Sequence, residues 1–269
     1  MIKVDVDLVT INVAVTESKG RLVTNLKRED FLITDEGQPV SLEFFDSKGP
    51  ASIVFVIDIS SSMQGKKWSA IENAMKKFLA AAHEGDDYTL IAFSERPQLL
   101  ALSVHSDKFW QTLTKLQPNG PTALYDAVML GLSVLERVPQ RHKAIVLLSD
   151  GQDNCSNSTL ADVQRETNNH RATIYSIGLL QQQRDLKRWE QDGRQLLDQL
   201  AAATGGLIQF PTPEEVHGVL DKISQDVTAH YCLSYYPPDK AGGWRRVGVS
   251  LTPNPRPFTL RYQQKYLRK

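Results

Sequence analysis

The chain has 269 residues, of which 41% are hydrophobic and 23% are charged, a composition typical of a globular protein. Its 31 lysines and arginines balance its 31 aspartates and glutamates, so the formal net charge is zero. This balance argues against a broad surface for nucleic acid or anionic lipid, and no run of 18 apolar residues predicts a membrane span.

The first 46 residues predict short β-strands. The segment V-D-V-D-L-V-T-I-N-V-A-V (4–15) alternates apolar and polar residues, as a strand with one buried face does. Further on, F-L-I-T and V-S-L-E-F-F flank the turn sequence D-E-G-Q-P. A segment of this size is too small to bury a core of its own.

From 51 to about 229, apolar strands alternate with amphipathic helices. The predicted strands are S-I-V-F-V-I (52–57), Y-T-L-I-A-F (88–93), A-I-V-L-L-S (144–149), T-I-Y-S-I-G (173–178) and G-L-I-Q-F (206–210). One predicted helix places Trp68, Ile71 and Met75 on a single face, and another places Leu124, Val128 and Leu132 together. Strands that are apolar on both faces and separated by helices indicate a parallel sheet covered on both sides.

After 229 the β pattern returns. The predicted strands are H-Y-C-L-S-Y-Y (230–236), W-R-R-V-G-V-S-L (244–251) and F-T-L-R-Y (258–262). We interpret Trp244 and the pair Tyr235-Tyr236 as core and edge of a β-sandwich. The basic segment R-Y-Q-Q-K-Y-L-R-K (261–269) is interpreted as a solvated terminus.

Together these patterns predict an α/β fold: a doubly wound, mostly parallel sheet flanked by helices and inserted into a small β-sandwich that both termini form. The predicted domain limits are 1–48 and 230–269 for the two parts of the sandwich and 49–229 for the α/β domain. Cys155 and Cys232 provide neither a disulfide framework nor a zinc site. One bridge between them or two unpaired thiols are both compatible with the sequence, which favours unpaired thiols.

Oxygen-bearing side chains gather where the predicted parallel strands end. V-F-V-I-D-I-S-S-S-M (54–63) places Asp58, Ser60 and Ser62 after the first such strand. Thr122 follows in P-N-G-P-T, and Asp150 ends the strand of L-L-S-D-G. Ligands of parallel α/β sheets lie beyond the carboxyl ends of the strands, and hard oxygen donors suit Mg²⁺. The alternative for the serines is helix capping, and Asp150 alone could serve a turn.

These five residues resemble the metal-ion-dependent adhesion site of the von Willebrand factor type A family. The family pattern is D-x-S-x-S, then a loop threonine, then a loop aspartate, and all five positions are intact: Asp58, Ser60, Ser62, Thr122 and Asp150. The resemblance covers roughly 50–229. It implies that a divalent cation binds these residues, Mg²⁺ first with Mn²⁺ and Ca²⁺ as alternatives, and that a Glu or Asp side chain of a protein partner completes the coordination.

The whole chain also resembles a bacterial subgroup of this family with a characteristic opening and close. V-T-I-N-V-A-V-T-E-S-K-G-R-L-V-T-N-L (9–26) departs from the opening only at Glu17, and Y-C-L-S-Y-Y-P with W-R-R-V matches the close. The resemblance implies metal-dependent protein binding outside the cytoplasm. It also implies that changes at the metal site can be relayed to the last helix, here about 213–229.

Two other functions compete with a binding module. A magnesium-dependent phosphatase would need a second carboxylate two residues after Asp58, where the chain has Ser60, and the sequence contains no glycine-rich phosphate loop. We therefore expect the chain not to be an enzyme. The other alternative is a structural module whose metal site only stabilises the fold.

Several polar residues near the five have plainer interpretations. Asp153 and Asn154 are expected to form a turn, and Glu95 to be a solvated loop residue near the metal face. Asp126 is expected to serve the start of its own helix, from where it could also support the site.

Overall fold

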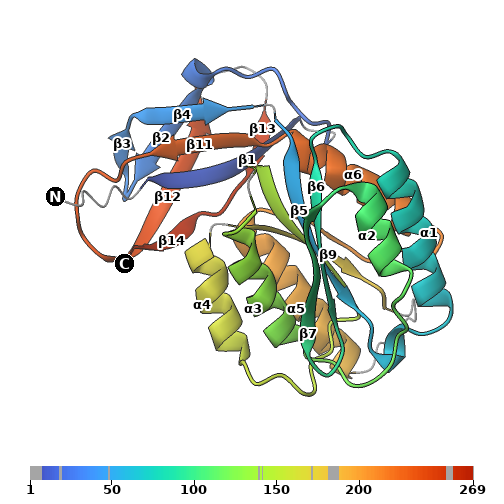
Figure 1. The fold of residues 1–269 in the computed structure, drawn as a ribbon. Helices are drawn as coiled ribbons and strands as arrows, with labels where there is room; N and C mark the ends of the chain where they lie inside the picture. Colours follow the sequence, from blue (N-terminus) through green and yellow to red (C-terminus); the bar gives the residue numbers. More distant parts are fainter. Residues whose placement is uncertain are drawn as a thin grey trace, which may run out of the picture.

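The structure is a computed structural model of the chain. It describes residues 8–17, 20–47, 49–138, 140, 142–170, 172–180, 188–252 and 257–268. Figure 1 shows two parts side by side, a β-rich part built from strands near both ends of the chain and an α/β part built from its middle. This arrangement confirms the predicted fold class.

The α/β part is built on a six-stranded sheet. Its strands, in spatial order, are β10 (Ile208–Gln209), β9 (Thr173–Gly178), β8 (His142–Ser149), β5 (Ala51–Asp58), β6 (Asp87–Phe93) and β7 (Pro97–Val104). All neighbours run parallel except β7, which forms an antiparallel hairpin with β6. The five predicted strands of this region are therefore confirmed, and β5 lies at the centre of the sheet.

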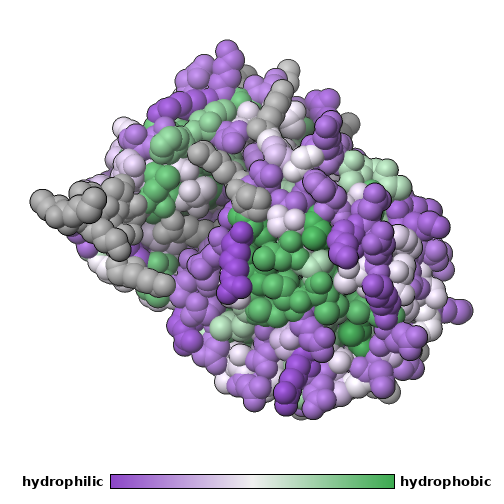
Figure 2. Space-filling view, viewed as in Figure 1, coloured by the Kyte–Doolittle hydropathy of each residue, from purple (hydrophilic) through white to green (hydrophobic). Residues whose placement is uncertain are grey.

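Strand β7 (Pro97–Val104) was not predicted from the sequence. Two register shifts interrupt its pairing with β6, and Ser103 has a φ of 48°. A bulge adds a residue to one strand, so apolar side chains no longer alternate with polar ones along it. Leu99 and Leu102 on β7 are 36% and 41% exposed, and Figure 2 shows a hydrophobic area over this edge of the sheet.

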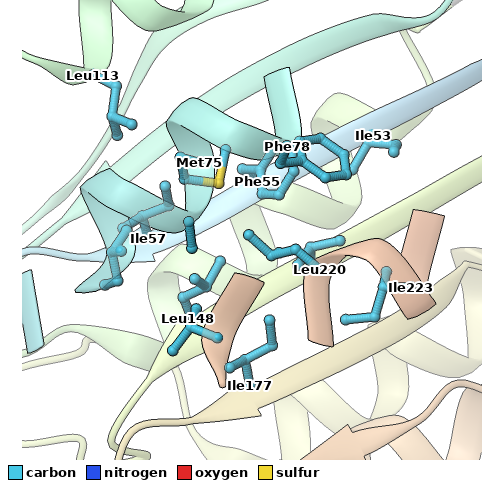
Figure 3. Packing of buried hydrophobic residues seen from close by; sticks show 14 of the residues in the cluster. Ile53, Phe55, Ile57, Met75, Phe78, Leu113, Leu148, Ile177, Leu220 and Ile223 are labelled. Atoms are coloured by element: carbon cyan, nitrogen blue, oxygen red, sulfur yellow. The ribbon is translucent and has the colours of Figure 1, made fainter. Parts of the chain in front are cut away.

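Helices cover both faces of the sheet. One face carries α1 (Lys66–Ala80), α2 (Ser106–Leu113) and α6 (Val216–Thr228), and the other carries α3 (Leu124–Leu135), α4 (Leu160–His170) and α5 (Arg188–Thr204). Side chains of β5 alternate between the two faces, as the period of two requires. Phe55 and Ile57 pack in the first core with Phe78 and Leu220, whereas Val56 belongs to the second (Figure 3).

The β-rich part consists of two four-stranded sheets that share one core. The first contains β13 (Phe258–Arg261), β1 (Val9–Glu17), β11 (Tyr231–Tyr235) and β4 (Leu42–Asp46), and the second β14 (Lys265–Arg268), β12 (Gly243–Leu251), β2 (Phe31–Asp35) and β3 (Gln38–Val40). A short 3-10 helix, η1 (Arg28–Asp30), precedes β2. Each sheet combines strands from both ends of the chain, and residues 4–7 of the predicted first strand lie outside the described residues.

Two details of the sandwich correct the sequence interpretation. The segment 261–268 is not a solvated end, because β14 pairs with β12 and Tyr266, 2% exposed, donates to Asp35 at 2.7 Å. Trp244 does not lie in the core either, because it is 55% exposed. Of the tyrosine pair, Tyr235 is fully buried and Tyr236 is 42% exposed. The period-two rule assigns neighbouring strand residues to opposite faces, and the sequence left open which face is covered.

A buried polar cluster joins the sandwich to the α/β part. Asp226, near the end of α6, accepts the hydroxyl of Tyr175 on β9 at 2.6 Å and pairs with His230 at 3.3 Å. Arg261 of β13 pairs with the same carboxylate and donates to the carbonyl of Gly205 at 3.0 Å. One carboxylate therefore connects the sheet, the last helix and a sandwich strand.

Two further predictions concern the whole chain. Cys155 and Cys232 are both free of disulfides, as the sequence favoured. In the described part of the chain, no helix combines the length and apolarity that crossing a bilayer requires.

Candidate functional site

The first part of the site is the turn that follows β5. β5 ends at Asp58, whose Oδ1 accepts the amide of Ser60 at 2.8 Å. The hydroxyls of Ser60 and Ser62 lie 3.1 Å apart, at the start of a 3-10 helix, η2 (Ser61–Met63). Ser60 makes no side-chain cap hydrogen bond, and the N-cap of α1 is Gly65. These two hydroxyls therefore do not perform the helix capping that the sequence left open.

The second part is the loop before α3, which is held against this turn by backbone hydrogen bonds. The amide of Asn119 donates to the carbonyl of Ile59 at 2.7 Å, and the amide of Ser61 donates to the carbonyl of Gly120 at 3.0 Å. The Ser61 hydroxyl in turn accepts the amide of Gly120 at 2.9 Å. These bonds fix the position of Thr122, two residues further along the chain.

The third part is the loop after β8. Ile57 and Leu148 are paired in the parallel register of β5 and β8, so Asp58 and Ser149 follow as neighbours. The Ser149 hydroxyl donates to Asp58 Oδ2 at 2.7 Å and accepts the amide of Gly151 at 3.0 Å. The strand order thus places Asp150 beside the turn that carries Asp58.

The second and third loops are also bonded to each other. The amide of Thr122 donates to Asn154 Oδ1 at 2.8 Å, and the amide of Asn154 donates to the carbonyl of Thr122 at 2.9 Å. The carboxylate of Asp153 accepts the amide of Tyr125 at 2.9 Å. Asp153 and Asn154 therefore do more than form a turn, because they bind the loop that carries Thr122.

The two carboxylates of this site are buried, and burial makes a negative charge on them unfavourable. Asp58 is fully buried, Ser60, Thr122 and Asp150 are at most 3% exposed, and Ser62 is exposed. Burial raises the pKa of Asp58 from 3.8 to about 6; hydrogen bonds from Ser60 and Ser149 oppose this shift and the nearby charge of Asp150 adds to it. Lys67 on α1 offsets part of the negative charge, with its ammonium 3.2 Å from Asp150 Oδ2.

The donor set of these three loops fits a hard divalent cation. It consists of two carboxylates and three hydroxyls, all oxygen donors of the kind that Mg²⁺ prefers in proteins. Among the described residues, no three His, Cys, Asp or Glu side chains gather in a way that would hold a metal. A cation at this edge of the sheet would therefore depend on the hydroxyl oxygens as well as on the two carboxylates.

The loop of Asp150 lies directly against α5. Gly151 has a φ of +80°, and a Cβ on it would lie 2.5 Å from the carbonyl oxygen of Gly193. Gly151→Ala is expected to destabilise the fold by roughly 3 kcal/mol, because backbone strain and a steric clash add. Gly37→Ala is the matched control, since Gly37 has a φ of +78° and open space around it. Urea denaturation of both variants measures the difference, and equal losses would show that α5 does not constrain the loop.

Two residues that shape the site, Ser149 and Lys67, were not singled out from the sequence. Ser149 is identified only through the register of β5 and β8. Asn154 was expected only as a turn residue, and its bond to Thr122 was not foreseen. Lys67 has no sequence signal beyond its place after D-x-S-x-S, because its contact with Asp150 spans 83 positions.

Two other candidates lie near the site but are not part of it. Glu95 is exposed, as expected for a solvated loop residue. Asp126 lies in the first turn of its own helix α3, where a negative charge is favourable, as expected. Its carboxylate also accepts the amides of Asn157 and Ser158, both at 2.9 Å, and so holds the segment that leads into α4.

Comparisons with known proteins agree with this architecture. The von Willebrand factor type A domain profile matches residues 53–152. The inter-alpha-trypsin inhibitor heavy chain H3 of Bos taurus is 26% identical over 185 residues, which are 57% of this chain and 21% of that protein. The chain thus matches only about a fifth of the length of this relative.

Solved structures show the same fold. The von Willebrand factor type A protein from Catenulispora acidiphila aligns with a TM-score of 0.58 and 12% identity over 99% of this chain and 74% of its own. Proximal thread matrix protein 1 from the mussel byssus, solved with a zinc-occupied MIDAS motif, aligns with a TM-score of 0.56 and 17% identity over 73% of this chain and 50% of its own.

A third structure is the vWF domain of the type V pili tip protein Mfa5 from Porphyromonas gingivalis. It aligns with a TM-score of 0.52 and 17% identity over 67% of this chain and 95% of its own. The profile match covers the turn with Asp58, the loop with Thr122 and the end of β8 with Asp150. Residues 53–152 of this chain, which include all five predicted ligands, therefore match the von Willebrand factor type A domain.

Proposed function

We propose that this chain is a metal-ion-dependent protein-binding module. Asp58, Ser60, Ser62, Thr122 and Asp150 would hold a divalent cation, with Mg²⁺ the best match and Mn²⁺ and Ca²⁺ as alternatives. The observation that carries this proposal is the network of hydrogen bonds that ties three loops, far apart in sequence, into one edge rich in oxygen donors.

The balance of charge in this donor set favours the capture of an acidic group. Three of the five donors are neutral hydroxyls, and one of the two carboxylates, Asp150, already shares its charge with Lys67. A bound divalent cation would supply an electrophilic centre for a carboxylate of the partner. Ser62 is exposed, so the site opens to the surface on the side where such a carboxylate would arrive.

A display library of random peptides would test this proposal. Peptides selected on the protein in Mg²⁺ and eluted with EDTA are expected to be enriched in Asp and Glu. Replacing that acid with Asn or Gln in a selected peptide should abolish its binding. Selected peptides that bind equally well in EDTA, or that carry no acidic residue, would contradict the proposal.

Metal affinity is expected to depend on pH through Asp58. Its pKa is raised from 3.8 to about 6, so its carboxylate is ionised above pH 6 and protonated below it. A proton on Asp58 excludes the cation, so Mg²⁺ affinity should level off above pH 6 and fall by up to about tenfold per pH unit below it. Calorimetric titrations between pH 8 and pH 5 measure this, and an affinity that is flat across pH 6 would contradict it.

Two alternatives lead to different results in the same samples. If the metal only stabilises the fold, Mg²⁺ would raise the melting temperature but the peptide selection would return no acidic ligand. If the chain were a phosphatase or esterase, a substrate panel would show turnover that Asp58→Ala abolishes. We favour a non-enzymatic role because Ser60 stands where such a phosphatase would need its second carboxylate.

The remaining proposals concern the setting of this module. We assign residues 49–229 to the type A domain and residues 1–48 and 230–269 to the sandwich that supports it. Its partner would be a protein encountered outside the cytoplasm, which the resemblance to the bacterial subgroup supports. Changes at the metal site would reach the sandwich through α6, because Asp226 contacts both parts.

A further inference from the structure

Lys67 contacts the site but is not one of its five proposed metal ligands. It lies in the first turn of α1, and its Nζ is 3.2 Å from Asp150 Oδ2. The side chain of Asp150 is 1% exposed and that of Lys67 is 23% exposed. The preceding residue, Lys66, is exposed and forms no ion pair with any described residue. Two adjacent lysines therefore have different environments, and only one of them contacts the site.

The position of Lys67 in α1 does not stabilise its positive charge. The N-terminus of a helix carries partial positive charge, so a lysine in the first turn is unfavourable and an acidic residue is preferred. The first turn of α1 contains no acidic residue. The stabilising partner of Lys67 is thus not its own helix but the buried carboxylate of Asp150.

Building on the proposed function, we propose that Lys67 is a tethered cation that competes with the divalent metal for Asp150 and sets the metal affinity of the site. An ammonium ion and a divalent cation that share one buried carboxylate repel each other, and burial leaves little solvent to screen this repulsion. A cation that enters the site must either displace the ammonium or bind against its charge. Lys67 therefore keeps metal binding weaker than the five oxygen donors alone would make it.

The opposite role predicts the opposite sign. If Lys67 instead held Asp150 in the position that the metal needs, its removal would weaken metal binding. Lys67→Met keeps most of the side-chain length and removes the charge, and Lys66→Met removes the same charge one residue away. Lys67→Arg retains the charge and therefore the competition.

Calorimetric titration of Mg²⁺ into EDTA-treated protein distinguishes these roles. Lys67→Met is expected to lower the Kd about tenfold, while Lys66→Met and Lys67→Arg stay within about twofold of the natural chain. In EDTA, Lys67→Met should melt at a lower temperature than Lys66→Met, because the charge of Asp150 is left buried without a partner. Mg²⁺ should then raise its melting temperature more than that of the natural chain.

The outcomes of these titrations distinguish a failure of this inference from a failure of the proposed function. An unchanged or higher Kd in Lys67→Met, with clear binding by the natural chain, would overturn the inference and leave the proposed function intact. If neither the natural chain nor any variant binds Mg²⁺, Mn²⁺ or Ca²⁺, both fail. If Lys67→Met does not fold in EDTA, Lys67→Gln takes its place in the titration, because it removes the charge but keeps a hydrogen-bond donor for Asp150. A Kd that is unchanged or higher in Lys67→Gln would then overturn the inference.

Discussion

Asp58→Asn is expected to weaken Mg²⁺ binding by roughly 100-fold or more, which corresponds to about 2.7 kcal/mol. The change removes one of the two carboxylates of the donor set, while the asparagine oxygen can still accept the amide that Ser60 donates to Asp58 Oδ1. Titration calorimetry on EDTA-treated protein measures the loss. Glu95→Gln neutralises an exposed charge on a neighbouring loop and should leave the affinity within about twofold.

The same variant has a second expected signature in EDTA. Burial raises the pKa of Asp58 to about 6, so its ionised form costs the fold up to about 3 kcal/mol above that pH. Asp58→Asn removes this charge, and at pH 8 the variant should be at least as stable as the natural chain when both are metal-free. A variant that binds Mg²⁺ like the natural chain would exclude Asp58 as a ligand. A variant that is strongly destabilised in EDTA would instead point to a purely structural role for the carboxylate.

Asp226→Ala is expected to destabilise the protein by about 3–5 kcal/mol, because it leaves the Arg261 charge without its buried carboxylate. It also removes the acceptor of the Tyr175 hydroxyl. Asp221→Ala is the matched control: Asp221 lies on the same helix, is 41% exposed and pairs with His217 at 3.3 Å. An exposed pair of this kind contributes about 0–1 kcal/mol.

Urea denaturation of both variants measures how much stability is lost at the buried Asp226 and how much at the exposed Asp221. Burial raises the pKa of Asp226, but the hydrogen bond and charge of His230 and the charge of Arg261 lower it on balance below 3.8. A carboxylate with a lowered pKa stabilises the fold above its unfolded pKa, and this contribution is lost as the pH falls through the folded value. The difference between the two variants should therefore shrink in strongly acidic solution. Losses of equal size near neutral pH would show that Asp226 does not join the two parts.

Much of the fold could be predicted from the sequence because its signals are local. The strand 52–57 is apolar at every position except Ser52, which is the mark of a strand covered on both faces, and β5 is indeed central. The sandwich could be inferred because neither end of the chain could bury an apolar face alone. The strand at 265–268 could not be predicted, because the contact that buries Tyr266 joins it to Asp35, 231 positions away.

Part of the site could likewise be predicted from local sequence signals, and part could not. Asp58, Ser60 and Ser62 are recognisable because they follow one strand within five residues, and Thr122 and Asp150 because each lies at a strand end or in a turn. The contributions of Ser149 and Lys67 depend on which strands are neighbours and on where α1 begins. Those are properties of the assembled sheet, and spacing along the chain does not encode them directly.

A crystal structure grown in Mn²⁺ tests the central claim most directly, because anomalous scattering locates this ion without reference to the protein atoms. One anomalous peak is expected at the carboxyl end of β5, among the side-chain oxygens of Asp58, Ser60, Ser62, Thr122 and Asp150. Well-ordered loops with no peak at that position in saturating Mn²⁺ would contradict the claim.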